Sequence, residues 1–172
     1  MLYFIRHGQT DANFRKINAG GESDIPLNDT GMAQARAFNA ANQEFLASID
    51  TVFVSPMIRA KQTMELVLGH HKKPIEVVED LRERMIGEWA GLPYDTTTDY
   101  FSTHPKDGEA WPVFLKRSID ALRYAADKHA GNVLVVAHGG IWYSYATLIN
   151  HPLLHIDNVG REEVCRIKLA GL

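Results

Sequence analysis

The sequence of 172 residues contains a single cysteine, Cys165, and this scarcity excludes two kinds of protein. One thiol cannot close an intrachain disulfide, and it cannot form a Cys-x-x-Cys metal or redox motif. The start of the chain also lacks the basic flank, full apolar core and cleavage site of an export signal. We therefore expect a cytoplasmic protein.

Long apolar runs and long runs of one charge are missing as well. The apolar stretches fall far short of the roughly 20 residues that a membrane-spanning helix needs, so we expect no membrane partner. The formal net charge is −3 and Lys and Arg form no long run, which argues against a nucleic-acid partner. The chain has neither a His-Glu-x-x-His motif nor the Gly-Lys pair of a P-loop, which argues against those two kinds of hydrolase.

The sequence does contain a regular alternation of apolar runs and amphipathic segments. Apolar runs predict buried strands at residues 2–5, 51–54, 74–78 and 133–137, and an alternating segment predicts an edge strand at 164–169. Helical spacing predicts one helix from about residue 28 to 49, one that starts at Ser55-Pro56, one around 115–126 and one over 141–149. Residues 14–28 read as a long loop. The order predicts a single α/β domain over residues 1–172, a three-layer α/β/α sandwich with a mostly parallel sheet and an irregular insertion at about 92–112.

Histidine, arginine and glycine gather where the predicted strands end. Arg6-His7-Gly8 follows the first strand, His138-Gly139-Gly140 follows the strand that ends at residue 137, and Ser55 follows the second, with Arg59 in the next helical turn. Open α/β sheets bind ligands at the carboxyl ends of their strands, so these residues should meet at one edge. Two arginines, two histidines and backbone N–H groups at helix starts favour a compact dianion such as a phosphoryl group.

A neutral histidine at this edge could attack phosphorus and form a covalent intermediate, which divides ester cleavage into two displacements. The residues alone do not distinguish His7 from His138 as the nucleophile, although Arg6 and the polar loop beside it favour His7. His138 would then be a cation that stabilises charge on the phosphoryl oxygens. Glu83, between a strand and a loop, is the best candidate for the acid that protonates the leaving group, with Glu88 as the competing carboxylate.

Four segments of the chain resemble the motifs of the histidine phosphatase superfamily, which has the phosphoglycerate mutase-like fold. They are residues 6–13 (Arg-His-Gly-x-Thr-x-x-Asn), 55–63 (Ser-x-x-x-Arg-Ala-x-x-Thr), 83–89 (Glu-x-x-x-Gly-x-Trp) and 135–140, which contains the second histidine. They follow the family's order over nearly the whole chain. The resemblance implies His7 as nucleophile, Glu83 as proton donor, and Arg6, Arg59, His138 and Asn13 as phosphate ligands, with Gly20 and Gly139 at the substrate site. It also implies that no metal or organic cofactor is needed.

Other positions bear on the substrate. Ala90 stands where the family commonly has glutamate, and Tyr143 stands where many of its phosphatases carry arginine. Asp107-Gly108-Glu109, followed by Phe114 and Arg117, resembles the α-ribazole phosphatase type.

These observations predict a phosphomonoesterase that hydrolyses a small phosphorylated metabolite through phospho-His7. A phosphoglycerate mutase-type phosphotransferase is the alternative, because it would use the same pocket. A mutase substrate carries extra negative charge and should need added cations, yet residues 92–111 contain only Lys106. Gly140 also stands where mutases usually have asparagine. A silent phospholigand-binding module is a third reading, which the intact His7 and Glu83 disfavour. The sequence does not indicate an oligomeric state.

Overall fold

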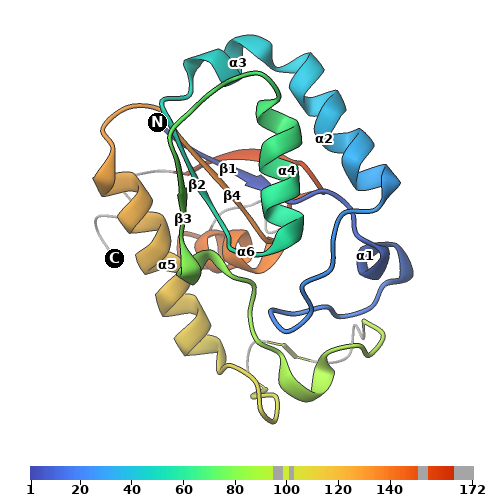
Figure 1. Cartoon of the computed structure of the whole chain (residues 1–172). Coiled ribbons are helices and arrows are strands. Elements are labelled where there is room, and N and C mark those ends of the chain that lie inside the picture. Colours follow the sequence, from blue (N-terminus) through green and yellow to red (C-terminus); the bar gives the residue numbers. More distant parts are fainter. Residues whose placement is uncertain (95–98, 101–102, 151–154, 165–172) are drawn as a thin grey trace.

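The computed structural model describes residues 1–94, 99–100, 103–150 and 155–164. Its centre is a five-stranded sheet with the strand order β3-β2-β4-β1-β5 (Figure 1). The strands are β1 (Leu2–Arg6), β2 (Thr51–Val54), β3 (Ile75–Val77), β4 (Val133–Ala137) and β5 (Arg161–Val164). The first four run parallel, and β5 lies antiparallel to β1 at the edge. The predicted α/β fold with a mostly parallel sheet is confirmed.

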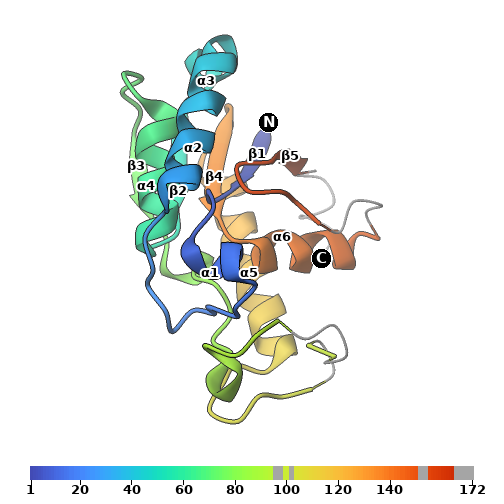
Figure 2. The same cartoon turned by 90° about the vertical axis from the view of Figure 1, so that its right-hand side faces the viewer.

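Helices cover both faces of this sheet (Figures 1 and 2). The helices α2 (Asp29–Ala41), α3 (Gln43–Ser48) and α4 (Ile58–Leu68) lie on one face, and α5 (Trp111–Lys128) and α6 (Gly139–Leu148) lie on the other. Successive strand residues point to opposite faces, so Phe4 and Val135 pack toward α5 and α6, whereas Ile5 and Val136 pack toward α2 and α4. A strand that is buried on both faces reads as a continuous apolar run, which is why the sequence located the central strands.

The amphipathic segment after residue 28 forms two helices, so the single predicted helix is wrong. Asn28 caps α2 by accepting the Gly31 N–H at 2.9 Å. That helix stops at Asn42, whose side-chain amide donates to the Phe38 carbonyl at 2.8 Å, and α3 begins at the next residue. Asparagine interrupts the helix because its side chain offers the backbone an alternative hydrogen bond.

The predicted helix start at Ser55-Pro56 is also wrong, because α4 begins at Ile58. The Ser55 hydroxyl contacts Nε2 of His138 at 2.7 Å and accepts the Met57 N–H at 3.3 Å. The serine therefore lies directly after β2 and does not cap α4. Arg59 still lies in the first turn of α4, as the spacing predicts.

Two other segments differ from their predicted bounds. The region after β1 contains a short helix, α1 (Asp11–Arg15), which Thr10 and Asn13 close with reciprocal side-chain caps. The predicted edge strand exists as β5, but it begins at Arg161, and residues 165–169 lie outside the described residues.

The segment between β3 and α5 lies at the same end of the sheet as α1 (Figures 1 and 2). It contains two single-turn 3-10 helices, η1 (Glu79–Leu81) and η2 (Gly87–Trp89). Within the predicted insertion, Pro93 pairs with Ile17 in an isolated β-bridge, and α5 already begins at Trp111. In the part of the chain that the structure describes, no helix is long and apolar enough to cross a membrane.

Candidate active site

The candidate site lies where β1 and β4 end side by side. β1 continues toward α1 and α2, whereas β4 continues into α6 on the opposite face of the sheet (Figure 2). Such a divergence of neighbouring parallel strands opens a crevice at their carboxyl ends. A cavity of about 360 Å³ occupies this position. Seven of the predicted site residues line it: Arg6, His7, Asn13, Gly20, Arg59, Glu83 and Gly139.

The His7 side chain is only 4% exposed, and its Nδ1 lies 2.7 Å from the Gly8 carbonyl oxygen. A carbonyl oxygen can only accept a hydrogen bond, so Nδ1 carries the proton and Nε2 keeps its lone pair. Burial lowers the pKa of His7 well below its usual value, and the nearby Arg59 and Arg6 lower it further. His7 is therefore a neutral imidazole at neutral pH, which is the state that a nucleophile requires.

The backbone around His7 is fixed from several directions. The Gly8 N–H donates to the Thr63 hydroxyl at 2.9 Å, and the Asn158 side chain donates to the His7 carbonyl at 2.8 Å. A Cβ at position 8 would lie 2.7 Å from the Gly31 carbonyl oxygen, so only glycine fits where these two backbone segments approach each other. No sequence pattern indicated Asn158, since it lies in an irregular segment far along the chain.

His138 lies behind His7 and does not contribute to the cavity wall. The two rings are 5.1 Å apart between centroids, and His138 is fully buried. The Ser55 hydroxyl accepts from a backbone N–H, so its own proton can be donated to Nε2 of His138, which places the imidazole proton on Nδ1. This Nδ1 is buried and has no hydrogen-bond partner among the described residues.

Burial runs against the positive charge predicted for His138, whose role at the site stays a prediction. Burial lowers the pKa of His138 well below its usual value, and the charge of Arg59 is the next largest cause. His138 is therefore neutral at neutral pH, and it offers a hydrogen-bond donor in place of a full positive charge. The sequence could not indicate this, because the result depends on burial and on charges from other elements.

The two arginines of the site are held by carbonyl groups. Arg59 donates to the Gly20 carbonyl at 3.1 Å, and Arg6 donates from Nη1 to the Ile156 carbonyl at 2.9 Å. Nε of Arg6 is buried, and among the described residues no carboxylate forms an ion pair with either arginine. Burial lowers the pKa of both guanidinium groups, and the charge of Glu83 partly opposes this. A buried Arg59 and a half-buried Arg6, both without an ion-pair partner among the described residues, favour a bound anion.

Glu83 faces the same cavity from the loop after η1. Its Oε1 accepts the Arg84 N–H at 3.0 Å, and its Oε2 accepts the Gly140 N–H at 3.1 Å. A Cβ on Gly140 would lie only 2.1 Å from Oε1 of Glu83, so this glycine makes room for the carboxyl group. The competing Glu88 is exposed and binds the Lys106 N–H at 3.1 Å, outside the cavity. Sequence reasoning did not include Gly140 in the site, although the glycine pair after His138 was a visible signal.

Three further predicted residues shape the wall. Oδ1 of Asn13 accepts from both the N–H and the hydroxyl of Thr10, at 3.1 Å each, so Asn13 can offer its amide NH₂ to a ligand. Gly20 has a φ of +61°, and a Cβ there would lie 2.4 Å from Cγ1 of Ile86. A Cβ on Gly139 would lie 3.3 Å from Nε of Arg6, which is a mild crowding.

The other end of the cavity is mostly apolar and aromatic. Trp111 and Tyr143 face each other there nearly at right angles, with ring centroids 6.1 Å apart. The Arg84 guanidinium packs over Trp111 at 5.7 Å, and over Trp89 at 5.8 Å on the other side. The other apolar or aromatic residues that line the cavity, at either end, are Ile17, Ala19, Ile86, Tyr94, Tyr100, Phe114 and Ile156. Within the described ranges, no group of three or more His, Cys, Asp or Glu is arranged to hold a metal ion.

Comparison with known proteins gives a consistent assignment. Residues 2–170 match the histidine phosphatase superfamily (branch 1). The uncharacterized phosphatase PhoE of Bacillus subtilis is 30% identical over 158 residues, which cover 85% of this chain and 75% of that protein. The adenosylcobalamin/alpha-ribazole phosphatase of Escherichia coli is 29% identical over 153 residues, covering 81% and 74%. The alpha-ribazole phosphatase structure from Shigella flexneri superposes with a TM-score of 0.79 at 26% identity, covering 93% of this chain and 87% of that one.

Proposed function

This chain belongs to the histidine phosphatase superfamily, and from that premise we propose that it is a phosphomonoesterase acting through a phosphohistidine at His7. One observation carries the proposal. Nδ1 of His7 is bound to the Gly8 carbonyl, which leaves the Nε2 lone pair for attack on phosphorus. The named phosphatase relatives support hydrolysis as the outcome.

In the first step, Nε2 of His7 attacks phosphorus, the N–P bond forms and the P–O ester bond breaks. The proton on Nδ1 stays in place, and the Gly8 carbonyl stabilises the positive charge that the ring acquires. Glu83 gives a proton to the leaving oxygen, so that the alcohol departs uncharged. Arg6 and Arg59 bind the phosphoryl oxygens.

In the second step, Glu83 acts as a base. Its carboxylate takes a proton from water, and the water oxygen attacks phosphorus. The N–P bond breaks, the electron pair returns to Nε2 of His7, and inorganic phosphate leaves. The proton taken from water stays on Glu83, so the proton donor of the first step is restored for another turnover.

We infer that the substrate is a small monoester whose alcohol carries apolar or aromatic surface. Trp111 and Tyr143 stand where that alcohol would lie. A phosphoglycerate substrate would require a cation there for its carboxylate. Arg84 is the cation nearest to this ring pair, and its guanidinium is stacked on Trp111. Its Nε and Nη1 donate to the carbonyls of Glu109 and Tyr100, and its Nη2 is a buried donor without a partner among the described residues. The preference for hydrolysis over mutase chemistry therefore rests on the apolar and aromatic lining and on the named phosphatase relatives.

The experiment is steady-state release of inorganic phosphate, in the presence of EDTA, from an aryl phosphate, α-ribazole phosphate and the phosphoglycerates. His7→Ala is the test variant and His70→Ala, at an exposed histidine, is the matched control. We expect metal-independent release that His7→Ala abolishes and His70→Ala preserves. Transfer between phosphoglycerates without release would identify a mutase instead. Phosphate binding without any turnover would identify a silent binding module, and full activity in His7→Ala would exclude the nucleophile.

A further inference from the structure

The guanidinium group of Arg117, in α5, binds the loop that carries Glu83. Its Nε and Nη2 donate to the two carboxylate oxygens of Glu109 at 2.7 and 2.8 Å. Its Nη1 donates to the carbonyls of Asp80 and Arg82 at 2.8 and 2.7 Å, and its Nη2 donates to the Glu83 carbonyl at 3.1 Å. These bonds engage all five N–H groups that an arginine possesses.

Glu109 binds the same loop on the other side of Glu83. The Glu109 N–H donates to the Met85 carbonyl at 2.7 Å, and the Glu109 carbonyl accepts from Nε of Arg84 at 2.9 Å. The side chains of Arg117 and Glu109 are only 20% and 12% exposed. A bidentate pair with this little exposure is held more firmly than an ion pair at the surface. The backbone is therefore fixed both before and after Glu83.

Neither Arg117 nor Glu109 lines the cavity. Two residues that do line the cavity contact this pair or the loop that it binds. One is Glu83, whose carboxyl group accepts the Gly140 N–H, and the other is Phe114. Phe114 lies one helical turn before Arg117, packs under its guanidinium at 4.7 Å and lines the cavity. One helix thus holds the loop of Glu83 and the apolar wall beside it.

We propose that Arg117 and Glu109 are positioning residues for proton transfer by Glu83. Their contacts set the loop so that the Glu83 carboxyl group meets the leaving oxygen. They do not assist the attack by His7. The inference rests on the proposed phosphatase function and adds to it the residues that make Glu83 an effective acid.

This role has a kinetic signature that a general loss of stability does not have. Proton donation matters most when the leaving alcohol is a strong base, and it matters little for an activated phenol. The second displacement uses Glu83 with every substrate, but kcat/KM reports only the first displacement, in which the alcohol leaves. A misplaced Glu83 should therefore lower kcat/KM selectively for poor leaving groups. Lysine at position 117 would keep the positive charge, but it lacks the planar fork needed to bind a carboxylate and three carbonyls together.

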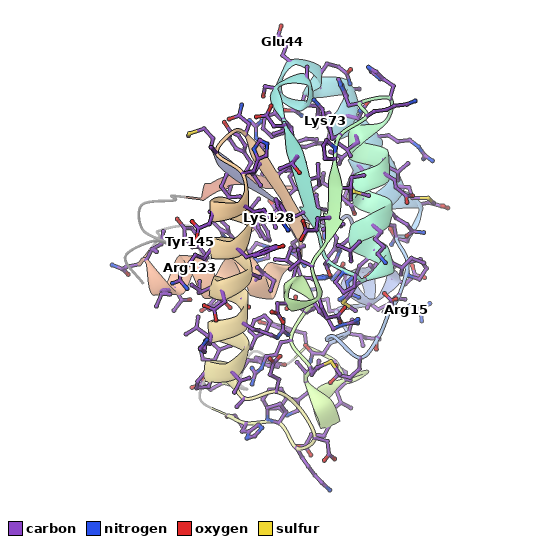
Figure 3. The ribbon with its side chains drawn as sticks, turned by 60° about the vertical axis from the view of Figure 1, so that its left-hand side comes forward. Arg15, Glu44, Lys73, Arg123, Lys128 and Tyr145 are labelled. Carbon is purple, nitrogen blue, oxygen red and sulfur yellow. The ribbon has the colours of Figure 1, made fainter. Side chains whose placement is uncertain are left out.

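The experiment compares kcat/KM of Arg117→Lys, Arg117→Gln and Glu109→Gln along a series from 2,4-dinitrophenyl phosphate to phenyl phosphate and an alkyl phosphate. Arg123→Gln is the matched control, since Arg123 lies on the same helix (Figure 3) and pairs with Asp120 at 2.8 Å. We expect Arg117→Lys to lose about 10- to 100-fold on phenyl phosphate and less than about threefold on the dinitrophenyl ester. Arg123→Gln should match the wild type on every substrate.

A double variant separates positioning from general damage. If Arg117 acts through Glu83, adding Arg117→Lys to Glu83→Gln should lower kcat/KM by less than about twofold further. Equal losses across the series, together with additive losses in the double variant, would overturn the inference. Thermal unfolding identifies variants that do not fold, and Arg117→Lys, which keeps the charge, then carries the test if Arg117→Gln does not fold.

The two proposals fail in different ways. A wild-type protein that releases no phosphate from any ester contradicts the proposed function, and the inference falls with it. A wild-type phosphatase in which Glu83→Gln selectively slows poor leaving groups, but Arg117→Lys does not, contradicts the inference alone.

Discussion

The two ends of the cavity are built from different kinds of structure. At the phosphate end, Arg6 is the last residue of β1, His7 follows it directly, and Arg59 lies in the first turn of α4. Backbone groups hold all three residues. At the opposite end, the wall is formed by Trp111, Tyr143 and residues from the irregular segment before α5. The strand ends and α4 thus hold the groups proposed for phosphoryl transfer, whereas α5, α6 and the segment before α5 shape the space proposed for the alcohol. Such a division lets one scaffold serve different substrates.

The largest expected effect comes from the phosphate end. His7→Asn should lower kcat/KM by at least about 10⁴-fold, because it removes the nucleophile on which both displacements depend. The loss should be equally complete for aryl, sugar and alkyl phosphates, because the alcohol plays no part in it. Rates measured with several substrates check this. A substrate that His7→Asn still hydrolyses at an appreciable rate would break the division between the two ends.

Substitution of Gly140, which lies beside the Glu83 carboxyl group, tests whether Glu83 is the proton donor. A methyl group there would meet Oε1 of Glu83 at 2.1 Å, so Gly140→Ala should displace the acid and lower kcat/KM for phenyl phosphate by about 100-fold. Gly139→Ala is the matched comparison, because its methyl group would meet only the flexible Arg6 side chain, at 3.3 Å. We expect a smaller loss there. Wild-type rates in Gly140→Ala would show that Glu83 is not the donor.

At the alcohol end, a change should alter the order of substrates and leave the chemistry intact. Tyr143→Arg places a cation opposite Trp111, and it should improve kcat/KM for 3-phosphoglycerate by about tenfold relative to naphthyl phosphate, since roughly 1.4 kcal/mol corresponds to that ratio. Tyr143→Phe, which keeps the ring, should leave the order unchanged. An unchanged order in Tyr143→Arg would mean that the alcohol binds elsewhere.

The smallest expected effect is a pH dependence of the free energy of unfolding, which arises from the two histidines of the phosphate end. Burial lowers the pKa values of His7 and His138 in the folded protein, so below about pH 6.5 the unfolded chain binds protons that the folded chain does not. The free energy of unfolding should therefore fall as the pH decreases from 6.5, by up to about 1.4 kcal/mol per pH unit for each histidine. Above pH 7 these two groups should add no slope.

Urea unfolding at pH 7.5, 6.5 and 5.5 measures this dependence. His138→Asn should make it shallower, whereas His155→Asn, at an exposed histidine of the cavity rim, should not. Equal slopes in the wild type and His138→Asn would contradict the buried neutral histidine.

The phosphate end could be predicted from the sequence because local signals define it. The apolar runs gave the ends of β1, β2 and β4, and the parallel sheet brought Arg6, His7 and Arg59 together. The prediction failed where distant residues decide the outcome. The Ser-Pro pair predicts Ser55 as a helix cap, yet its hydroxyl contacts His138, which is 83 positions away in the sequence.

The alcohol end could be predicted much less well. Trp111 begins α5, and Tyr143 lies within α6. Periodicity shows which helix face is apolar, but it does not show which apolar residues face a cavity and which face the core. The contacts of Arg117 with three backbone carbonyls are equally invisible in the sequence, because any residue could supply those carbonyls.

The phosphohistidine intermediate can be tested by mass spectrometry of the enzyme quenched in alkali during turnover of 2,4-dinitrophenyl phosphate. The good leaving group makes the first displacement fast, so the phosphoenzyme should accumulate. The account predicts one acid-labile phosphoryl group, located on His7 and absent from His7→Asn. A phosphoryl group on any other residue, or continued turnover of this ester by His7→Asn, would contradict it.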